Sequence, residues 1–497
     1  MRSPSSRTAG EFPVVLDRDA ERPLPVQLAA ALRELIDLGT LRPGEPVPAT
    51  RPFAHRLGVA RGVVVSAYEQ LLAEGYLRAE RGRGTIVNPE LRGSRVRQGN
   101  PLRRETASSP DPEHGADPVL PRPPLAPGAP VTDAVLRSPW RAAWREAAAR
   151  VDRPAPPFGD ARLRHEIAEH LRLVRGTSRS ADDVLVTAGT REGLGLLLTA
   201  LGTTRGHGLV VGVEDPGYPS LRGVAARHGA RILSLPVDAD GLRVDRLPSG
   251  VLDLVIVTPS HQYPVGGSLP LPRRRELLEW AARTGVIVIE DDYDSEFRSI
   301  GGPLPALAAL DDPDSGAVVT LGTFSSLVSP ALSAGFLLAP ARIRTLLEPV
   351  RRDLGAPVST VVQVALAEYL ASGELRRNIA RVRRRHAVRR DLISERLAGI
   401  PGVRPRPMSG GLHAVIEFTA GTASAEELFR REARLVDRAA EPTPQLPNGL
   451  GIAALGAYWQ HQSRERVAGL VLGMGGPDDE EFAAAIDRLG ALLDSAQ

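Results

Sequence analysis

The chain has 497 residues, 42% hydrophobic and 24% charged, a composition typical of a globular protein with two or three domains. The formal net charge of +3 does not by itself indicate nucleic-acid binding, although residues 1–100 hold 15 Arg against 11 acidic residues. No apolar run is long enough to span a membrane, and the first residues lack a signal-peptide core, so a cytoplasmic location is expected. Because there is no cysteine, disulfides, thiolate metal sites and a cysteine nucleophile are excluded.

Every one of the 62 basic residues in the lysine-plus-arginine count is arginine. A GC-rich coding bias is the simplest cause. Whatever the cause, arginine stays protonated at working pH and cannot serve as a Schiff-base amine, whereas lysine can. Covalent aldehyde chemistry through a lysine is therefore excluded for this chain.

Residues 22–88 predict a winged helix of three helices and a hairpin, preceded by a flexible N-terminus, residues 1–21. The first helix ends at Gly39, and Thr50 is the expected N-cap of a second helix that ends at Gly58. The apolar stripe of the first helix consists of Leu28, Leu32, Leu35 and Ile36. The stripe of the third helix consists of Val64, Tyr68, Leu71 and Leu72. The stretch YLRAERGRGTIV then reads as strand, glycine-containing tip and strand.

A short helix, a tight turn and a second helix form helix-turn-helix geometry, in which the second helix enters the DNA major groove. Arg61 begins that helix, Arg51 begins the preceding one, and Arg81 and Arg83 flank the hairpin tip. A single arginine is more often a solvated surface charge, but four at these places favour DNA binding. The predicted DNA-binding residues are Thr50, Arg51, Arg61, Arg81, Gly82, Arg83 and Gly84.

This segment resembles the GntR family of bacterial transcription regulators in the stretches PLPVQL, GTLRPGEPVPATR, LGVARGVVVSAYEQLLAEGYL and RGRGT. The resemblance implies a double-stranded DNA operator as partner. The family usually has Ser-Arg-x-Thr at the start of the recognition helix, where this chain has Ala60-Arg61-Gly62-Val63. Two hydroxyl contacts are therefore missing, which leaves the operator sequence open.

Beyond the hairpin, residues 89–130 are rich in Pro, Arg, Ser and Gly and predict an extended, semi-rigid linker. Helices then alternate with short apolar strands, which predicts an α/β large domain, residues 131–340, with a mostly parallel sheet covered on both faces. The expected strands are DVLVT, GLVVGV, RILSLPV, LDLVIVT, VIVIED, AVVTLG and GFLLAP. A smaller α+β terminal subdomain is expected over residues 341–497.

The basic run at residues 376–390 resembles a nucleic-acid patch at first sight. Its spacing favours instead one long, solvated helix that carries Ile379 and Val382 inward.

Ligands of open α/β sheets bind at the carboxyl ends of the strands. Four stretches end strands there: VTAGTREG, whose helix start suits phosphate, VEDPGYPS, TPSHQYPVGG and IEDDYDSEF. The candidate binding residues in them are Gly189, Thr190, Tyr218, His261, Asp291 and Tyr293.

From about residue 126 to the end, the chain resembles the fold-type-I aminotransferases, and TPSHQYPVG with EDDYDSEFR resembles the MocR/GabR subfamily of GntR regulators. The resemblance implies that Asp291 pairs with the protonated pyridine nitrogen of pyridoxal phosphate (PLP), and that Tyr293 bonds the ring hydroxyl. It also implies that Tyr218 stacks on the ring, and that the Gly189–Thr190 turn and Ser325 hold the phosphate. The alternative is that these residues only end strands in an inherited fold.

The family's lysine-bearing segment reads Gly-Thr-Phe-Ser-Lys, with an arginine seven positions after the lysine. This chain has Ser326 at the lysine position and Ser333 at the arginine position, and GLVLGMGG (469–476) lacks the arginine that binds a substrate carboxylate in catalytic relatives. We therefore expect no catalytic and no metal-binding residues. The effector or vestigial cofactor pocket is expected to contain Gly189, Thr190, Tyr218, His261, Asp291, Tyr293, Ser325, Ser326 and Ser333.

The leading hypothesis is a homodimeric DNA-binding transcription regulator whose aminotransferase-like domain senses a small effector without covalent PLP. That effector is PLP or pyridoxamine phosphate held non-covalently, or another molecule; a regulator with no effector and a purely structural dimer scaffold remain open. The alternative from another class is a PLP-dependent aminotransferase fused to a DNA-binding domain, which the missing lysine disfavours.

Overall fold

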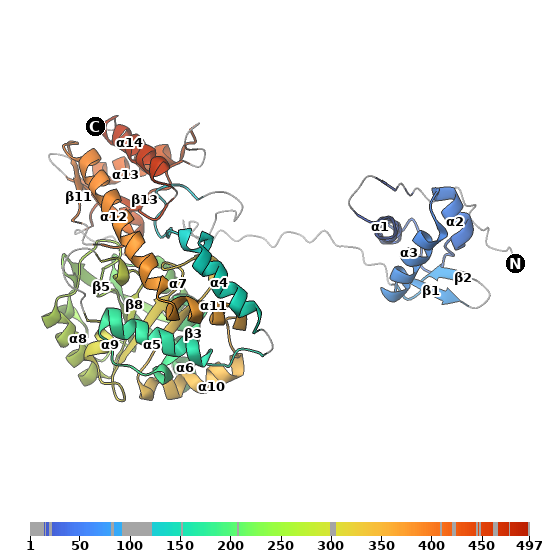
Figure 1. Cartoon of the computed structure of the whole chain (residues 1–497). Helices are drawn as coiled ribbons and strands as arrows, with labels where there is room; N and C mark the ends of the chain where they lie inside the picture. The colour runs from blue at the N-terminus through green and yellow to red at the C-terminus, as the bar shows by residue number, and fades with distance from the viewer. Residues whose placement is uncertain are drawn as a thin grey trace. The chain divides into compact units, whose positions relative to one another are not determined.

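The computed structural model divides the chain into two compact units, Met1–Pro110 and Asp111–Gln497, which we describe separately (Figure 1). The residues that the structure describes are 14, 16–18, 22–80, 84–91, 122–150, 153–205, 208–298, 305–407, 410–419, 424–443, 446, 449–460, 466–476 and 478–495. Within these residues, no helix has both the length and the apolar character needed to cross a membrane.

The N-terminal unit is a three-helix winged helix. Its elements are α1 (Leu24–Asp37), α2 (Thr50–Leu57), α3 (Arg61–Ala73) and the antiparallel strands β1 (Leu77–Glu80) and β2 (Gly84–Val87). Gly58 ends α2 at φ +62°, a left-handed conformation that glycine adopts without a steric penalty, and the chain enters α3 three residues later. This confirms the predicted turn. Thr50, however, is the first residue of α2, and the N-cap is Ala49, so the N-cap prediction was wrong.

The core of this unit follows the predicted helical stripes with one exception. Leu28, Leu32 and Ile36 of α1 are buried, as are Val64, Tyr68 and Leu71 of α3. Leu72 is exposed, and Ala67 is buried instead.

Part of the segment that precedes α1 is anchored to this unit. Val14 and Leu16 pack against its core, and the guanidinium Nη2 of Arg18 donates a hydrogen bond to the Gly58 carbonyl at 2.6 Å. Flexibility of the whole stretch 1–21 does not agree with these contacts.

The C-terminal unit contains an eight-stranded sheet in the order β3-β10-β9-β8-β7-β4-β5-β6. Its strands are β3 (Val184–Thr187), β4 (Val210–Asp215), β5 (Arg231–Asp238), β6 (Gly241–Leu242), β7 (Leu254–Val257), β8 (Ile287–Asp292), β9 (Val318–Thr323) and β10 (Gly335–Leu338). All seven expected strands are present. Strands β5, β4, β7, β8 and β9 run parallel, and β10 is antiparallel to β9 and β3, so the sheet is mostly parallel as predicted.

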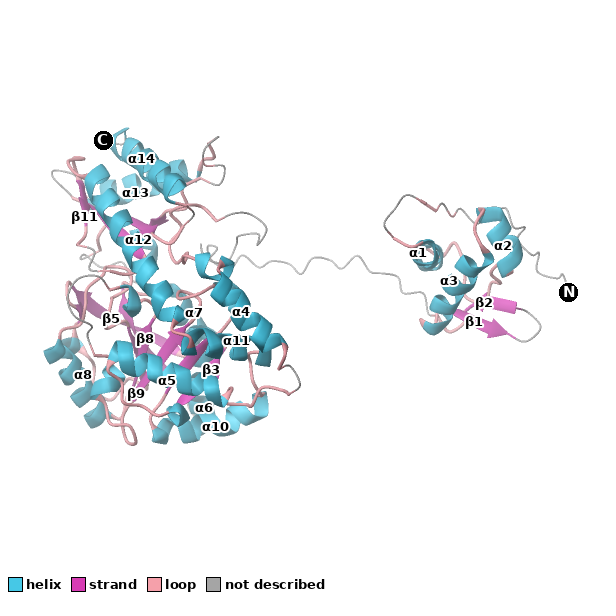
Figure 2. Ribbon diagram, viewed as in Figure 1, coloured by secondary structure: helices cyan, strands magenta, loops and turns pink. Residues whose placement is uncertain are grey.

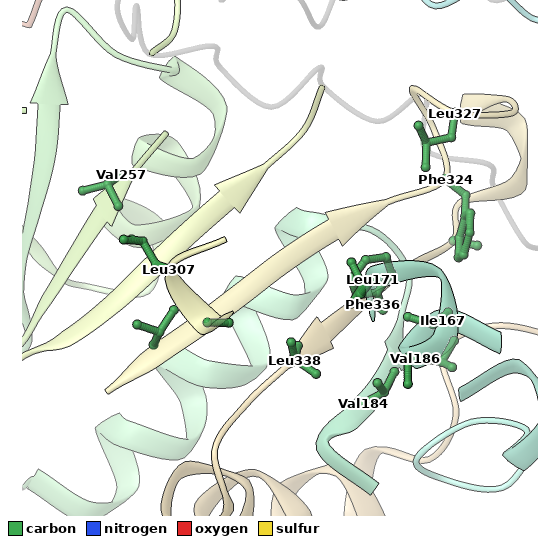
Figure 3. Packing of buried hydrophobic residues seen from close by; sticks show 14 of the residues in the cluster. Ile167, Leu171, Val184, Val186, Val257, Leu307, Phe324, Leu327, Phe336 and Leu338 are labelled. Atoms are coloured by element: carbon green, nitrogen blue, oxygen red, sulfur yellow. The ribbon is translucent and has the colours of Figure 1, made fainter. Parts of the chain in front are cut away.

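Helices cover both faces of this sheet (Figure 2). They are α4 (Ser138–Ala148), α5 (Ala161–Arg175), α6 (Thr190–Arg205), α7 (Pro219–Arg227), α8 (Leu271–Thr284), α9 (Leu307–Leu310), α10 (Ala341–Leu354), α11 (Thr360–Ala371) and α12 (Glu374–Leu397). Alternate residues of each strand enter different cores: Val184 and Val186 pack with α5, whereas Leu185 packs with α6, α7 and α10. Figure 3 shows Val184 and Val186 beside Ile167 and Leu171 of α5.

The small subdomain has its own core and a four-stranded antiparallel sheet in the order β11-β12-β14-β13. Its elements are β11 (Val403–Pro405), β12 (His413–Phe418), α13 (Ala425–Ala440), β13 (Ala453–Ala454), β14 (Gly469–Gly473) and α14 (Asp479–Ser495). Helix α12 joins the two cores, because Ile379 and Val382 belong to the large core and Ile393 to the small one. The division between the cores therefore falls within α12, later than residue 341.

The long helix predicted over the basic run is confirmed by α12, with Ile379 and Val382 buried. The end of the predicted linker differs from expectation. Leu125 is buried in the small core, its N–H donates to the Leu450 carbonyl at 2.9 Å, and its carbonyl accepts from the Gly473 N–H at 2.8 Å. The connector is thus fixed to the small subdomain well before residue 130.

Candidate functional site

In the winged helix, the starts of α2 and α3 meet at one corner. Arg61 is exposed, and its Nε donates to the Thr50 hydroxyl at 3.4 Å, while Arg51 beside Thr50 is also exposed. The Tyr68 hydroxyl donates to the Pro48 carbonyl at 2.8 Å and ties α3 to the segment that leads into α2. Three of the predicted DNA-binding residues, Thr50, Arg51 and Arg61, therefore lie together at this corner.

The predicted basic wing is only partly within the described residues. Gly84 begins β2 at φ +82°, a conformation that suits a tight hairpin. Arg81, Gly82 and Arg83 lie outside the described residues.

In the C-terminal unit, the sheet register brings the candidate residues to one edge. Thr187 at the end of β3 and Thr323 at the end of β9 both pair with Gly335 at the start of β10. Asp292 at the end of β8 pairs with Gly322. The stretches that follow β3, β9 and β8 therefore leave the sheet at the same edge, as the sequence predicted.

Asp291 is the most unusual residue at this edge. Its side chain is 4% exposed, and among the described residues its Oδ1 has no hydrogen-bond partner. Burial, and after it the nearby carboxyls of Asp292, Asp294 and Glu214, together raise the pKa of the Asp291 carboxyl to about 8. A buried carboxyl with an unused oxygen is suited to a ligand nitrogen, because one proton can be shared between the two groups.

Two further buried carboxyls lie beside Asp291. Burial raises the pKa of Glu214 to about 7, against hydrogen bonds from Thr258 and Gln262 that lower it. Burial also raises the pKa of Asp292 to about 7, although Arg175 forms an ion pair with it at 2.9 Å. This edge therefore favours a ligand that brings positive charge or a proton donor.

Asp291→Asn is expected to raise the free energy of unfolding above that of the wild type at about pH 9. The increase should be smaller at about pH 5. A folded-state pKa near 8 lies above the ordinary value of about 3.9, so the folded protein holds an extra proton between these values. The stabilisation that this proton gives is complete below about pH 4 and is lost as pH rises through 8. Chemical unfolding at both pH values measures the difference.

Asp245→Asn is the matched control for this prediction. Asp245 is exposed and the Arg243 hydrogen bond lowers its pKa, so it stays ionised over the whole range and its change should not depend on pH. An equal effect of Asp291→Asn at both pH values would contradict the assignment of a proton to Asp291.

Tyr293 contacts both His261 and Ser326 at the same edge. The Tyr293 hydroxyl donates to the His261 carbonyl at 3.1 Å, and the two rings stack with centroids 6.2 Å apart. The Ser326 hydroxyl donates to the Tyr293 carbonyl at 2.8 Å. At the family's lysine position the chain thus has a serine, whose hydroxyl bonds to the backbone next to the residues predicted to hold the PLP ring.

The predicted phosphate end is also located here, without its usual cation. Gly189 has φ +99°, and it packs so closely on Gly335 that a Cβ on Gly335 would lie 2.9 Å from the Gly189 Cα. Thr190 begins α6, Ser325 donates its N–H to the Thr323 hydroxyl at 3.0 Å, and Ser333 has the left-handed φ of 44°. The turn fits an anion, whereas Ser333 supplies no charge.

Sequence reasoning missed several residues of this region. Tyr218, which was predicted, lies in edge-to-face contact with Tyr263, and Tyr263 in turn contacts His413 and Tyr458. Tyr458 and His413 come from the small subdomain, and no local pattern marked them.

Arg191 was also missed, although it lies within the motif VTAGTREG. It is an exposed cation at the start of α6 and is hydrogen-bonded to the Ser220 hydroxyl.

Two family models match the chain. Residues 24–87 match "Bacterial regulatory proteins, gntR family", and residues 128–443 match "Aminotransferase class I and II". Among solved structures, the chain is similar to an archaeal alanine:glyoxylate aminotransferase, with a TM-score of 0.63 and 23% identity over 75% of this chain and 91% of that one. The chain is also similar to the Pyrococcus horikoshii kynurenine aminotransferase, with a TM-score of 0.62 and 23% identity over 75% of this chain and 90% of that one. These likenesses show the fold.

The relatives combine both parts. The HTH-type pyridoxine biosynthesis transcriptional regulator PdxR of Corynebacterium glutamicum is 41% identical over 95% of this chain and 96% of its own length. The probable rhizopine catabolism regulatory protein MocR of Rhizobium meliloti is 34% identical over 76% of this chain and 78% of its own.

Fold and site together define a GntR-type winged helix joined to a fold-type-I aminotransferase fold, which is the composition of a DNA-binding regulator. The chain belongs to the MocR-type family of HTH transcriptional regulators.

Proposed function

We propose that the aminotransferase-like domain of this regulator is a dimerisation and effector-sensing domain, not an enzyme. The observation that carries the proposal is Ser326: the chain has no lysine, and at the family's lysine position a hydroxyl bonds to the Tyr293 carbonyl. A hydroxyl cannot form the Schiff base on which PLP-dependent amino transfer depends.

The remaining residues fit a vitamin B6 phosphate held without a covalent bond. The free Oδ1 of Asp291 suits the ring nitrogen, the Tyr293 hydroxyl oxygen can still accept a bond, and the turn at Gly189 suits the phosphate. When bound, such a ring supplies an electron sink. Here the side chains would bind and orient the ring, and Asp291 would share a proton with the ring nitrogen. The relative named as a pyridoxine biosynthesis regulator supports this class of effector.

A homodimer follows from how such a regulator binds DNA. Two winged helices on a palindromic operator bind far more tightly than one, because the second contact becomes intramolecular. An effector then changes DNA binding only if it binds one arrangement of the domains better than another.

The proposal is tested with the full-length protein in two steps. Native mass spectrometry of the purified protein shows its oligomeric state and any retained ligand. DNA duplexes are then selected from a random pool, and the affinity of the protein for them is measured with and without PLP or pyridoxamine phosphate. We expect a dimer whose DNA affinity changes when one of these two compounds is added. Amino-group exchange by the pure protein, dependent on added PLP, would contradict the proposal, and a monomer would contradict the dimerisation part of it.

Arg61→Ala is expected to weaken binding to the selected operator by roughly 1–3 kcal/mol, because a side chain at the start of the recognition helix contacts base edges. Fluorescence anisotropy at fixed salt measures the loss. Arg33→Ala is the control, because Arg33 forms an ion pair with Glu74 just past the far end of α3. If both variants bind like the wild type, Arg61 is not a recognition residue.

A further inference from the structure

A second polar cluster lies where the large and small subdomains meet. His261 follows β7, Asp294 follows β8, and His413 is the first residue of β12 in the small subdomain. One ligand atom from each residue lies within 4.8 Å of the other two. The three residues are 8%, 2% and 3% exposed, so the cluster is buried. Two imidazoles and one carboxylate are the donors that divalent transition metals prefer.

His413 is held in the tautomer that a metal requires. Its Nε2 lies 2.8 Å from the Pro264 carbonyl oxygen, and because a carbonyl only accepts, Nε2 carries the hydrogen. Nδ1 therefore keeps a lone pair, and within the described part of the chain this buried atom has no hydrogen-bond partner. A metal-binding histidine typically donates its other ring N–H to a carbonyl in this way.

His261 and Asp294 form the other half of the cluster. His261 Nδ1 lies 2.8 Å from Asp294 Oδ2, which also accepts the Leu412 N–H at 3.2 Å. Gly411 makes this approach possible, since a Cβ there would lie 2.3 Å from His261 Cε1 and 2.6 Å from Asp294 Oδ2. Among the described residues, the ion pairs of Asp294 include His261 and no arginine. A buried carboxylate with two imidazoles and no permanent cation is a site where a metal ion would supply the missing charge.

We propose that His261, Asp294 and His413 bind one divalent transition-metal ion, with Zn²⁺ the best match to two nitrogens and one oxygen. The ion would take the place of the hydrogen bond between His261 Nδ1 and Asp294 Oδ2. Three protein ligands leave one coordination position for water or for a donor atom of an effector. Because His413 comes from the small subdomain and the other two ligands from the large one, the ion links the two subdomains.

The test uses full-length protein stripped with a chelator and titrated with Zn²⁺ against a chromophoric competitor. We expect one tight equivalent per chain in the wild type. His413→Gln and Asp294→Asn should each weaken binding by about 100-fold or more, since each removes one of three ligands. His228→Gln is the control, because His228 lies at the end of α7, outside the cluster, where its Nδ1 contacts the Val224 carbonyl. This variant should bind Zn²⁺ like the wild type.

A wild type that takes up no Zn²⁺ under these conditions would overturn the proposal without any variant. So would cluster variants that bind as tightly as the control. X-ray absorption of the Zn²⁺-loaded wild type gives a further check that does not depend on the variants folding: it should show two imidazoles and only N/O ligands, and fewer than two imidazoles would sink the assignment. The readouts need neither DNA nor a B6 compound, so their failure is distinct from failure of the proposed effector.

Discussion

Ser326→Lys is expected to attach PLP covalently through the new lysine, a residue that the wild-type chain lacks. Ser326 follows β9, whose end pairs with β8 next to Asp291, and its hydroxyl already contacts the Tyr293 backbone. A lysine there restores the amine that the family places at this position. After incubation with PLP and borohydride, we expect about one fixed pyridoxyl group per chain, located on residue 326 by peptide mapping.

The absence of other lysines makes this experiment unusually clear. In the wild type only the terminal amine can be labelled, so any further label belongs to the introduced residue. Arg275→Lys is the control, because Arg275 is exposed on α8 and its lysine should react only as an ordinary surface amine does. Equal labelling of the two variants would show that Ser326 does not face a B6 site. Stoichiometric labelling of the wild type beyond its terminus would contradict the proposed function itself.

Arg274→Ala is expected to destabilise the aminotransferase-like domain by roughly 3–5 kcal/mol, the cost of breaking a buried polar network. Arg274 is fully buried in α8, and its guanidinium donates to three carbonyls: Leu269 at 2.7 Å, Pro305 at 2.8 Å and Pro259 at 2.6 Å. Burial lowers its pKa to about 10, so the group remains charged at neutral pH. The alanine variant leaves these carbonyls without their donor and opens a void.

Denaturant unfolding followed through the tryptophans measures this loss. Arg275→Ala is the control, since it removes the same side chain from the next, exposed position and should change stability by less than about 0.5 kcal/mol. Two of the three carbonyls bracket the loop that carries His261, so Arg274→Ala should also weaken Zn²⁺ and B6 binding. A loss no greater than that of the control would show that the network does not stabilise the domain.

The contrast between these two arginines shows how far sequence reasoning reaches. Strands of the large sheet were predictable because burial on both faces requires continuous apolar runs, such as the one that became β8. The run Arg273-Arg274-Arg275 carried no comparable signal: Arg273 pairs with Asp238, Arg274 is buried and Arg275 is exposed. Which arginine turns inward depends on carbonyls supplied by distant loops.

The candidate sites divide in the same way. Asp291 lies near the end of β8 and Tyr293 directly follows that strand, so a local motif was enough to find them. His413 reaches Pro264 across 149 residues, and Tyr458 reaches Tyr263 across 195, because the small subdomain folds back onto the strand ends. Contacts of this kind follow from tertiary packing, and periodicity does not reveal them. The change of core inside α12 escaped prediction for the same reason, since one uninterrupted helix serves both cores.

The buried Leu125 is a point at which the connector is attached to the C-terminal unit. Among the described residues that follow the winged helix, Leu125 is attached to the small subdomain through backbone hydrogen bonds with Leu450 and Gly473. A ligand that rotates this subdomain against the large sheet would displace the anchorage of the tether by the same amount. A movement of the small subdomain would therefore be passed to the described end of the connector through Leu125.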